Sequence, residues 1–194
     1  MMIFKKQTQQ EDSDEFLWNK LRQGDSDALE LIYCRYFATL YNYGLRLCGD
    51  EEIVKDCIQD LFVRLLSSKK TNTITNIRAY LMISLRNAIM ISNEYMKNQL
   101  NLEESMFDFS VSEDELLDLF PHDDDSMQIG LQLRKAYEKL NFNQKQAIYL
   151  YYIKNFSWKE IGTILNITPH SCMNLVARAV SKLHLLMTGQ EKIK

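Results

Sequence analysis

The stretch SWKEIGTILNITPHSCMNLVARAVSK, residues 157–182, decides the fold because it predicts a helix, a tight turn and a second helix. Ser157 is followed three residues later by Glu160, which is the spacing of a capping box at a helix start. The letters NITP then interrupt the apolar periodicity, and their Thr168 and Pro169 predict the cap and the first residue of the next helix. The stretch therefore predicts a helix-turn-helix.

The second predicted helix has two opposite faces. Its apolar stripe repeats at spacings of three and four and contains Cys172, Val176, Ala179, Leu183 and Leu186. Its polar stripe contains Ser171, Asn174, Arg178 and Ser181, with Lys182 beside it. Helix-turn-helix proteins enter the DNA major groove with such a short polar, cationic face, so the pattern favours DNA binding. The alternative interpretation is a plain helical hairpin whose polar face is solvated.

Charge is segregated along the chain, although the total is only −3. Residues 99–126 contain 10 Asp and Glu and no Lys or Arg, whereas residues 127–194 contain 10 Lys and Arg against 3 Asp and Glu. The basic block carries the predicted helix-turn-helix, and contacts between cations and phosphates supply most sequence-independent affinity for DNA. The acidic block predicts a solvated linker, and simple disorder is an equally good interpretation of it.

The composition predicts an all-α protein of one domain or two small ones. The 194 residues include only two prolines and six glycines, and 46% are hydrophobic, which is enough for real cores. No apolar run approaches the roughly 20 residues that cross a bilayer. The N-terminal residues also lack the apolar core of a signal peptide, so we expect a cytoplasmic protein. Scattered cysteines predict free thiols rather than a metal site; they are Cys34, Cys48, Cys57 and Cys172.

Apolar periodicity places helices on both sides of the acidic block. In the first half we expect helices at 15–23, at 26–47, from 50 onward and, after a polar loop at 67–76, from 76 onward. In the second half we expect helices at about 129–140, from 143 onward, and in the hairpin. The expected fold class is all-α, with two small helical domains joined by an acidic linker and a C-terminal helix-turn-helix module of four helices. The predicted boundaries are 1–98, 99–126 and 127–194.

The two halves together resemble a known family. The first half contains DCIQDLF, residues 56–62, in which an acidic residue, a Gln-Asp pair and a bulky apolar pair stand at the family's usual spacing. The second half contains LNFNQKQAIYLYYIKNFSWKEIGTILNITPHSCMNLVARAVSKL, residues 140–183, which is similar to the family's terminal module in order and spacing. The chain thus resembles alternative sigma factors of bacterial RNA polymerase, in the extracytoplasmic-function group, over residues 15–98 and 127–188.

This resemblance implies three binding surfaces. Core RNA polymerase would dock on the third helix, at Asp56, Gln59, Asp60, Leu61, Phe62 and Arg64. The melted minus-ten promoter strand would meet Lys69, Lys70, Arg78, Arg86 and Asn87. The minus-thirty-five promoter duplex would meet Lys159, Thr168, His170, Ser171, Asn174, Arg178 and Lys182. Tyr80 offers a stacking surface for a base, although its spacing fits the core better.

The resemblance implies a sequence-specific transcription initiation factor with no catalytic activity, no cofactor and no small-molecule substrate. It allows an anti-sigma factor as a partner besides core polymerase and promoter DNA. One departure stands out: after Asn87 the chain reads AIMISNEYMKNQLN, with Lys97 as its sole cation where relatives carry a basic cluster. This favours, as an alternative, a degenerate sigma-like interaction protein that binds polymerase or a regulator without reading promoters. A two-domain DNA-binding regulator is a third interpretation.

Overall fold

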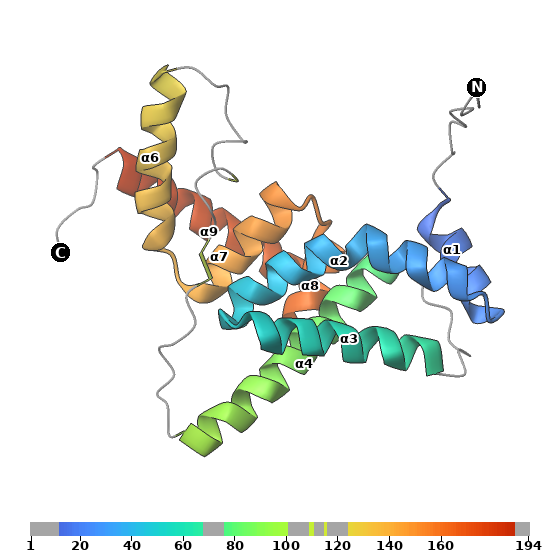
Figure 1. Ribbon diagram of the computed structural model, residues 1–194. Helices are drawn as coiled ribbons and strands as arrows, with labels where there is room; N and C mark the ends of the chain where they lie inside the picture. Colours follow the sequence, from blue (N-terminus) through green and yellow to red (C-terminus); the bar gives the residue numbers. More distant parts are fainter. Residues whose placement is uncertain (1–11, 68–75, 101–108, 111–114, 116–123, 189–194) are drawn as a thin grey trace, which may run out of the picture.

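The structure, a computed structural model, describes residues 12–67, 76–100, 109–110, 115 and 124–188. Within these ranges the chain is all-helical, as the sequence predicts. The N-terminal half contains α1 (Asp14–Arg22), α2 (Ser26–Cys48), α3 (Glu51–Ser67) and α4 (Ile77–Leu100). The C-terminal half contains α6 (Asp124–Glu138), α7 (Phe142–Ile148), the π-helix η2 (Tyr149–Ile153), α8 (Trp158–Leu165) and α9 (Pro169–Met187) (Figure 1).

Short polar side chains begin the two hairpin helices where the sequence places them. The Ser157 hydroxyl accepts a hydrogen bond from the backbone N–H of Glu160, and the Glu160 carboxylate accepts one from the N–H of Ser157 at 2.7 Å. Thr168 caps α9 by accepting a hydrogen bond from the N–H of Ser171 at 3.0 Å. Between the helices, Asn166 is left-handed with φ 56°. The predicted helix-turn-helix is therefore confirmed.

The hairpin turn folds back closely over the end of α8. The backbone N–H of Ile167 donates to the carbonyl oxygen of Gly162 at 2.8 Å. A Cβ atom added at Gly162 would lie 2.8 Å from the carbonyl oxygen of Ile167, so the turn needs a residue without a side chain there. This close approach fixes the direction in which α9 leaves the turn.

The N-terminal half is a bundle in which α2, α3 and α4 pack on one another and α1 packs on α2 and α4. Helices α2 and α3 approach closely at Gly44, where an added Cβ would lie 2.8 Å from the side chain of Val54. Cys57 of α3 is a buried free thiol, and so is Cys172 of α9, which confirms the interpretation of these two residues. Among the residues of the described ranges, no helix is long and apolar enough to cross a membrane.

In the C-terminal half, α9 packs on α6, α7 and α8. Two features differ from the expected helices. The first turn of α6 lies inside the predicted linker, since the helix begins at Asp124. The helix expected from residue 143 widens into a π-helix over Tyr149–Ile153, which apolar periodicity does not reveal.

The two halves are in contact. Helix α8 lies beside α4 (Figure 1). The rings of Tyr43 (α2) and Tyr149 (η2) stack with centroids 6.4 Å apart, and the Tyr43 hydroxyl donates to Oε1 of Gln146 at 3.1 Å. The buried residues of both halves consequently form one cluster. The division at 1–98 and 127–194 stays a prediction.

Candidate nucleic-acid and polymerase interface

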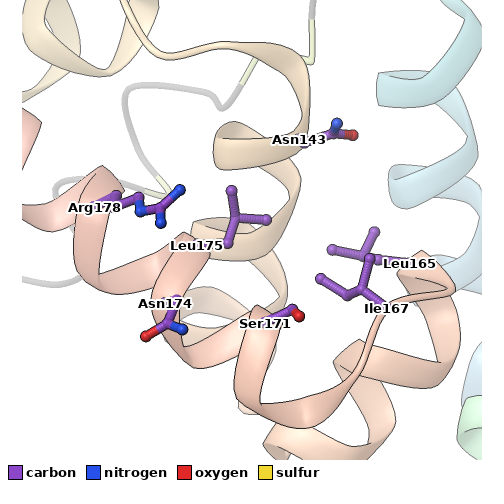
Figure 2. A pocket seen from close by; sticks show the side chains of 7 residues that line it. All are labelled: Asn143, Leu165, Ile167, Ser171, Asn174, Leu175 and Arg178. Atoms are coloured by element: carbon purple, nitrogen blue, oxygen red, sulfur yellow. The ribbon is translucent and has the colours of Figure 1, made fainter.

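The exposed face of α9 forms one side of a pocket of about 340 Å³ (Figure 2). It brings together three of the predicted DNA-reading residues with apolar neighbours; its lining is Asn143, Leu165, Ile167, Ser171, Asn174, Leu175 and Arg178. Sequence reasoning missed Asn143, because it stands on α7 and only the fold carries it to the recognition helix.

The predicted DNA-reading residues of α9 differ in how firmly the protein itself holds them. Arg178 and Asn174 are exposed, and neither makes a hydrogen bond or ion pair within the described part of the chain. The hydroxyl of Ser171 is 2.8 Å from that of Thr168, so it helps to cap the helix. The ammonium of Lys182 donates to the carbonyl oxygen of Lys139 at 2.6 Å, which ties it to the end of α6. Two other predicted residues are exposed: Lys159 in the first turn of α8 and His170 in the first turn of α9.

The first turn of α4 carries Arg78, one of the predicted strand-binding residues, and α8 lies beside this end of α4. Asn76 caps α4 by accepting a hydrogen bond from the N–H of Ala79 at 2.9 Å, and its amide donates to Oε1 of Glu160 at 2.7 Å. The guanidinium of Arg78 donates to the carbonyl oxygen of Lys154 and lies 3.7 Å from the ring centroid of Phe156. Both α4 side chains are therefore engaged by the C-terminal half.

The other predicted residues of α4 differ in how exposed they are. Asn87 is exposed, whereas Arg86 is half-buried and hydrogen-bonds Tyr43. Burial raises the pKa of Tyr43 above its ordinary value, and the nearby Arg86 works in the opposite direction. Tyr80 is 37% exposed rather than core, and its ring centroid lies 6.2 Å from that of Trp18. Lys69 and Lys70 lie outside the described residues.

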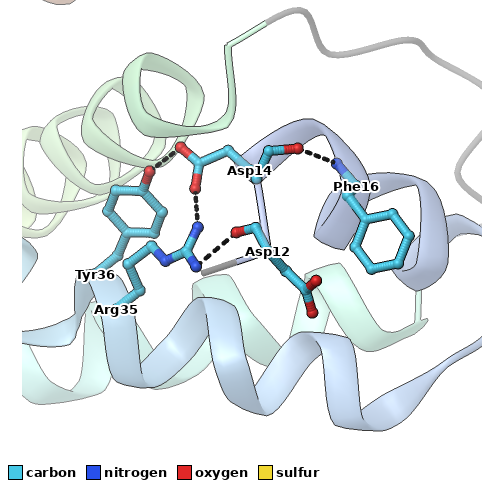
Figure 3. A network of polar contacts seen from close by, with 6 residues as sticks. Asp12, Asp14, Phe16, Arg35 and Tyr36 are labelled. Carbon is cyan, nitrogen blue, oxygen red and sulfur yellow. Dashed lines mark hydrogen bonds and ion pairs between the residues drawn. The ribbon is translucent and has the colours of Figure 1, made fainter. Parts of the chain in front are cut away.

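A polar network ties the start of α1 to α2 (Figure 3), and the same end of α1 lines a pocket with the start of α4. Arg35 donates to Oδ1 of Asp14 at 2.6 Å and to the carbonyl oxygen of Asp12 at 2.7 Å. The Tyr36 hydroxyl donates to the other Asp14 oxygen. Burial, and then this hydrogen bond to a carboxylate, raise the pKa of Tyr36. The network holds α1 so that Trp18 packs against Tyr80.

The predicted polymerase-docking face of α3 separates into exposed and interior residues. Asp56, Gln59, Asp60 and Arg64 are exposed. Leu61 and Phe62 are 2% and 6% exposed, so both side chains belong mainly to the core. Phe62 also lines a groove beside α3. The groove, of about 560 Å³, runs between α2 and α3; it is lined by Leu29, Tyr33, Phe37, Lys55, Gln59, Phe62, Val63 and Leu66.

Sequence reasoning missed the exposed apolar residues of this groove. Val63 and Leu66 are 55% and 61% exposed, and Tyr33 is 38% exposed with its ring edge-on to Phe62. The available signal was that Val63 and Leu66 fall off the buried stripe of α3 although they are apolar.

Each half of the chain matches the model of a known protein family. The family model for Sigma-70 region 2 matches residues 32–91, and the model for Sigma-70, region 4 matches residues 130–183. The chain belongs to the sigma-70 family. Together the two matches span more than half of its length, in the order that the sequence resemblance implied. The ECF RNA polymerase sigma factor SigM of Bacillus subtilis is 22% identical over 162 residues, which cover 81% of this chain and 94% of SigM. The protein is an ECF-type sigma factor.

Two solved structures share the fold of this sigma factor. CnrH, solved in complex with the cytosolic domain of CnrY, aligns with a TM-score of 0.59 at 18% identity, covering 92% of this chain and 99% of CnrH. RpoE from Bartonella quintana, solved with the anti-sigma factor NepR, aligns with a TM-score of 0.57 at 19% identity, covering 82% of this chain and 96% of RpoE.

This sigma factor is a transcription initiation factor that binds core RNA polymerase and directs it to promoters. Sigma factors are non-enzymatic transcription factors. No observation on the described residues favours the degenerate interaction protein that the missing basic cluster suggested.

Proposed function

We propose that this sigma factor divides promoter recognition and polymerase docking among three surfaces. The α2–α3 groove and its polar rim dock on core polymerase, the start of α4 holds the melted minus-ten strand, and the exposed face of α9 reads the minus-thirty-five duplex. The observation that carries the proposal is the α9 pocket, in which Ser171, Asn174 and Arg178 stand together at helical spacing.

The lining of the α9 pocket suits the edge of a base pair. Arginine pairs bidentately with guanine and asparagine with adenine, while apolar side chains contact the thymine methyl group. Arg178 and Asn174 supply the polar groups, and Leu175 lines the same pocket. Lys159 in the first turn of α8 and His170 in the first turn of α9 are exposed and can contact phosphates, which position a recognition helix on the duplex.

The start of α4 offers a cation beside an exposed ring. Single-stranded DNA is held by cations that follow its backbone and by aromatic rings on which bases stack. Tyr80 presents an exposed ring that Trp18 supports from behind, and Arg78 supplies a guanidinium two residues earlier. Lys69, Lys70, Arg86 and Asn87 complete the proposed strand-binding set, and Arg86 is half-buried beside Tyr43.

The α2–α3 groove has the anatomy of a protein interface. Such interfaces combine an apolar centre with a polar rim. Val63, Leu66 and Tyr33 supply the exposed apolar centre. The polar groups come from exposed residues of α3, of which Gln59 lines the groove itself; they are Asp56, Gln59, Asp60 and Arg64. We include an anti-sigma factor among the proposed partners, because the similar RpoE was solved with one.

Co-purification with core polymerase, followed by sequencing of the bound DNA, tests these assignments. The wild type should retain core polymerase and enrich related promoter sequences. Replacing Gln59 and Asp60 together with Lys should reduce core retention, whereas Glu52→Lys, an exposed charge change on the same helix, should not. Arg178→Ala should keep core polymerase but relax DNA selection at one base pair. Unchanged core retention by the folded double variant would refute the docking surface.

A further inference from the structure

Phe109, in the predicted acidic linker, is packed between the two halves. It is 0% exposed. Its ring lies edge-on to Tyr43 of α2 with centroids 5.9 Å apart and to Tyr149 of η2 at 5.3 Å. It also lies edge-on to Phe142 of α7 at 6.1 Å. Burial of a phenyl ring and edge-to-face contacts both stabilise such a cluster, so Phe109 joins helices of the two halves.

Glu115 makes a second bridge from the same segment. One carboxylate oxygen accepts a hydrogen bond from the guanidinium of Arg46 in α2. The other lies 3.7 Å from the ammonium of Lys154, directly after η2. Both cations also lie over the ring of Tyr149, at 4.9 and 5.3 Å from its centroid. One acidic side chain thus neutralises a cation from each half.

The interface that these bridges close contains polar atoms that water would satisfy if it opened. Nε2 of Gln146 and the hydroxyl of Tyr149 are buried and have no hydrogen-bond partner among the described residues. Buried polar atoms without partners cost stability, and exposure to water removes that cost. An interface with such groups in its centre is suited to reversible closure rather than to permanent association.

Closure also covers Arg78, one of the side chains proposed to hold the melted promoter strand, and its neighbour Asn76. The Asn76 amide is bonded to Glu160, and the Arg78 guanidinium is held by the Lys154 carbonyl and the Phe156 ring. Neither group can bind DNA while it keeps these partners. Arg78 is therefore available to DNA only after the C-terminal half has moved away.

We propose that Phe109 and Glu115 form an intramolecular latch that keeps this sigma factor closed, with its own C-terminal half covering the strand-binding residue Arg78. The covering role rests on the proposed function of Arg78, whereas the latch rests on the packing alone. Because both latch residues belong to the segment between the halves, displacing this one segment breaks both bridges together. The apparent affinity of the free protein for single-stranded DNA is then the affinity of the open form multiplied by the fraction of molecules that are open.

Small-angle X-ray scattering of the full chain tests the latch. Phe109→Ala should shift the closed–open equilibrium on the order of a hundredfold towards open, because it removes a fully buried ring. Glu115→Gln should shift it about fivefold, because its ion pairs are partly exposed. Both variants should show a larger radius of gyration with unchanged helical circular dichroism. Leu183→Ala weakens the core of the C-terminal half without touching the interface, so it should stay compact.

An unchanged radius of gyration in both latch variants, or equal expansion of Leu183→Ala, would overturn the proposal. Binding of a fluorescently labelled single-stranded DNA of random sequence provides the second measurement. Tighter binding by Phe109→Ala than by wild type, lost again when Arg78→Ala is added, supports the latch and its covering role. Expansion without tighter binding supports the latch and counts against the proposed role of Arg78. The two failures are therefore distinguishable.

Discussion

Replacing Arg178 by Ala should weaken DNA binding and leave the fold intact. The guanidinium is exposed on α9 and makes no hydrogen bond or ion pair with the described residues. Alanine is also a better helix former than arginine. Truncation should therefore change the free energy of unfolding by no more than about 0.5 kcal/mol, as for other surface positions. Any larger effect on DNA binding can then be assigned to the contact itself.

The size of the loss depends on what Arg178 contacts. A bidentate pair with guanine is worth about 1–3 kcal/mol, and its loss relaxes selectivity at one base pair. A phosphate contact is not sequence-specific, so its loss weakens all duplexes alike and lowers the salt dependence of log K by about 0.9. The pocket around Arg178 contains Asn174 and Leu175, which predicts the first outcome.

Binding of wild type and Arg178→Ala to a selected duplex and to random duplex, across several salt concentrations, separates these outcomes. Lys182→Ala is the matched control, because it removes a cation one turn further along α9 that the carbonyl of Lys139 already holds. We expect it to change DNA affinity less than Arg178→Ala does. Equal affinity and equal salt slope for wild type and Arg178→Ala would show that this face is merely solvated.

Three further outcomes are expected. Gly162→Ala should destabilise the fold by about 1–3 kcal/mol in urea unfolding, because the added methyl group meets the Ile167 carbonyl oxygen at 2.8 Å. Tyr36→Phe should lower stability by about 1 kcal/mol and leave the Asp14–Arg35 ion pair in place, measured in the same way. Burial opposes ionisation of Glu160, yet hydrogen bonds from Ser157 and Asn76 hold its pKa below the ordinary 4.5. The ionised Glu160 carboxylate thus stabilises the fold fully above about pH 4.5, and this stabilisation is lost as pH falls through the lowered pKa. Glu160→Gln should therefore lose less thermal stability than wild type between about pH 6 and about pH 3.

Helix starts were predictable because their causes are local. Each capping hydrogen bond joins residues that are three apart in the sequence: Ser157 with Glu160, and Thr168 with Ser171. The structure shows the hydrogen bonds that this spacing predicts. The polar stripe of α9 was predictable for the same reason, since helical periodicity alone places Asn174 and Arg178 on one face. The family resemblance added the order of the modules, which the comparisons confirm.

Contacts between distant segments were not predictable from periodicity. Lys182 and Arg86 are cations on helices, and nothing beside them in the sequence indicates that one is bonded to Lys139 and the other to Tyr43. Phe109 stands among acidic residues, so composition predicted solvation where three rings of other helices enclose it. In each case the partner lies on another element, and only tertiary packing brings the two together.

The π-helix η2 has a consequence for chain length. The N–H of Lys154 donates to the carbonyl oxygen of Tyr149 at 3.0 Å, five residues earlier, so this turn holds one residue more than an α-helical turn. Deleting one residue between Tyr149 and Ile153 would convert the turn to an α-helical one and leave the register of α7 unchanged. The segment is therefore a place where related chains can differ by one residue without moving the helix-turn-helix relative to α7.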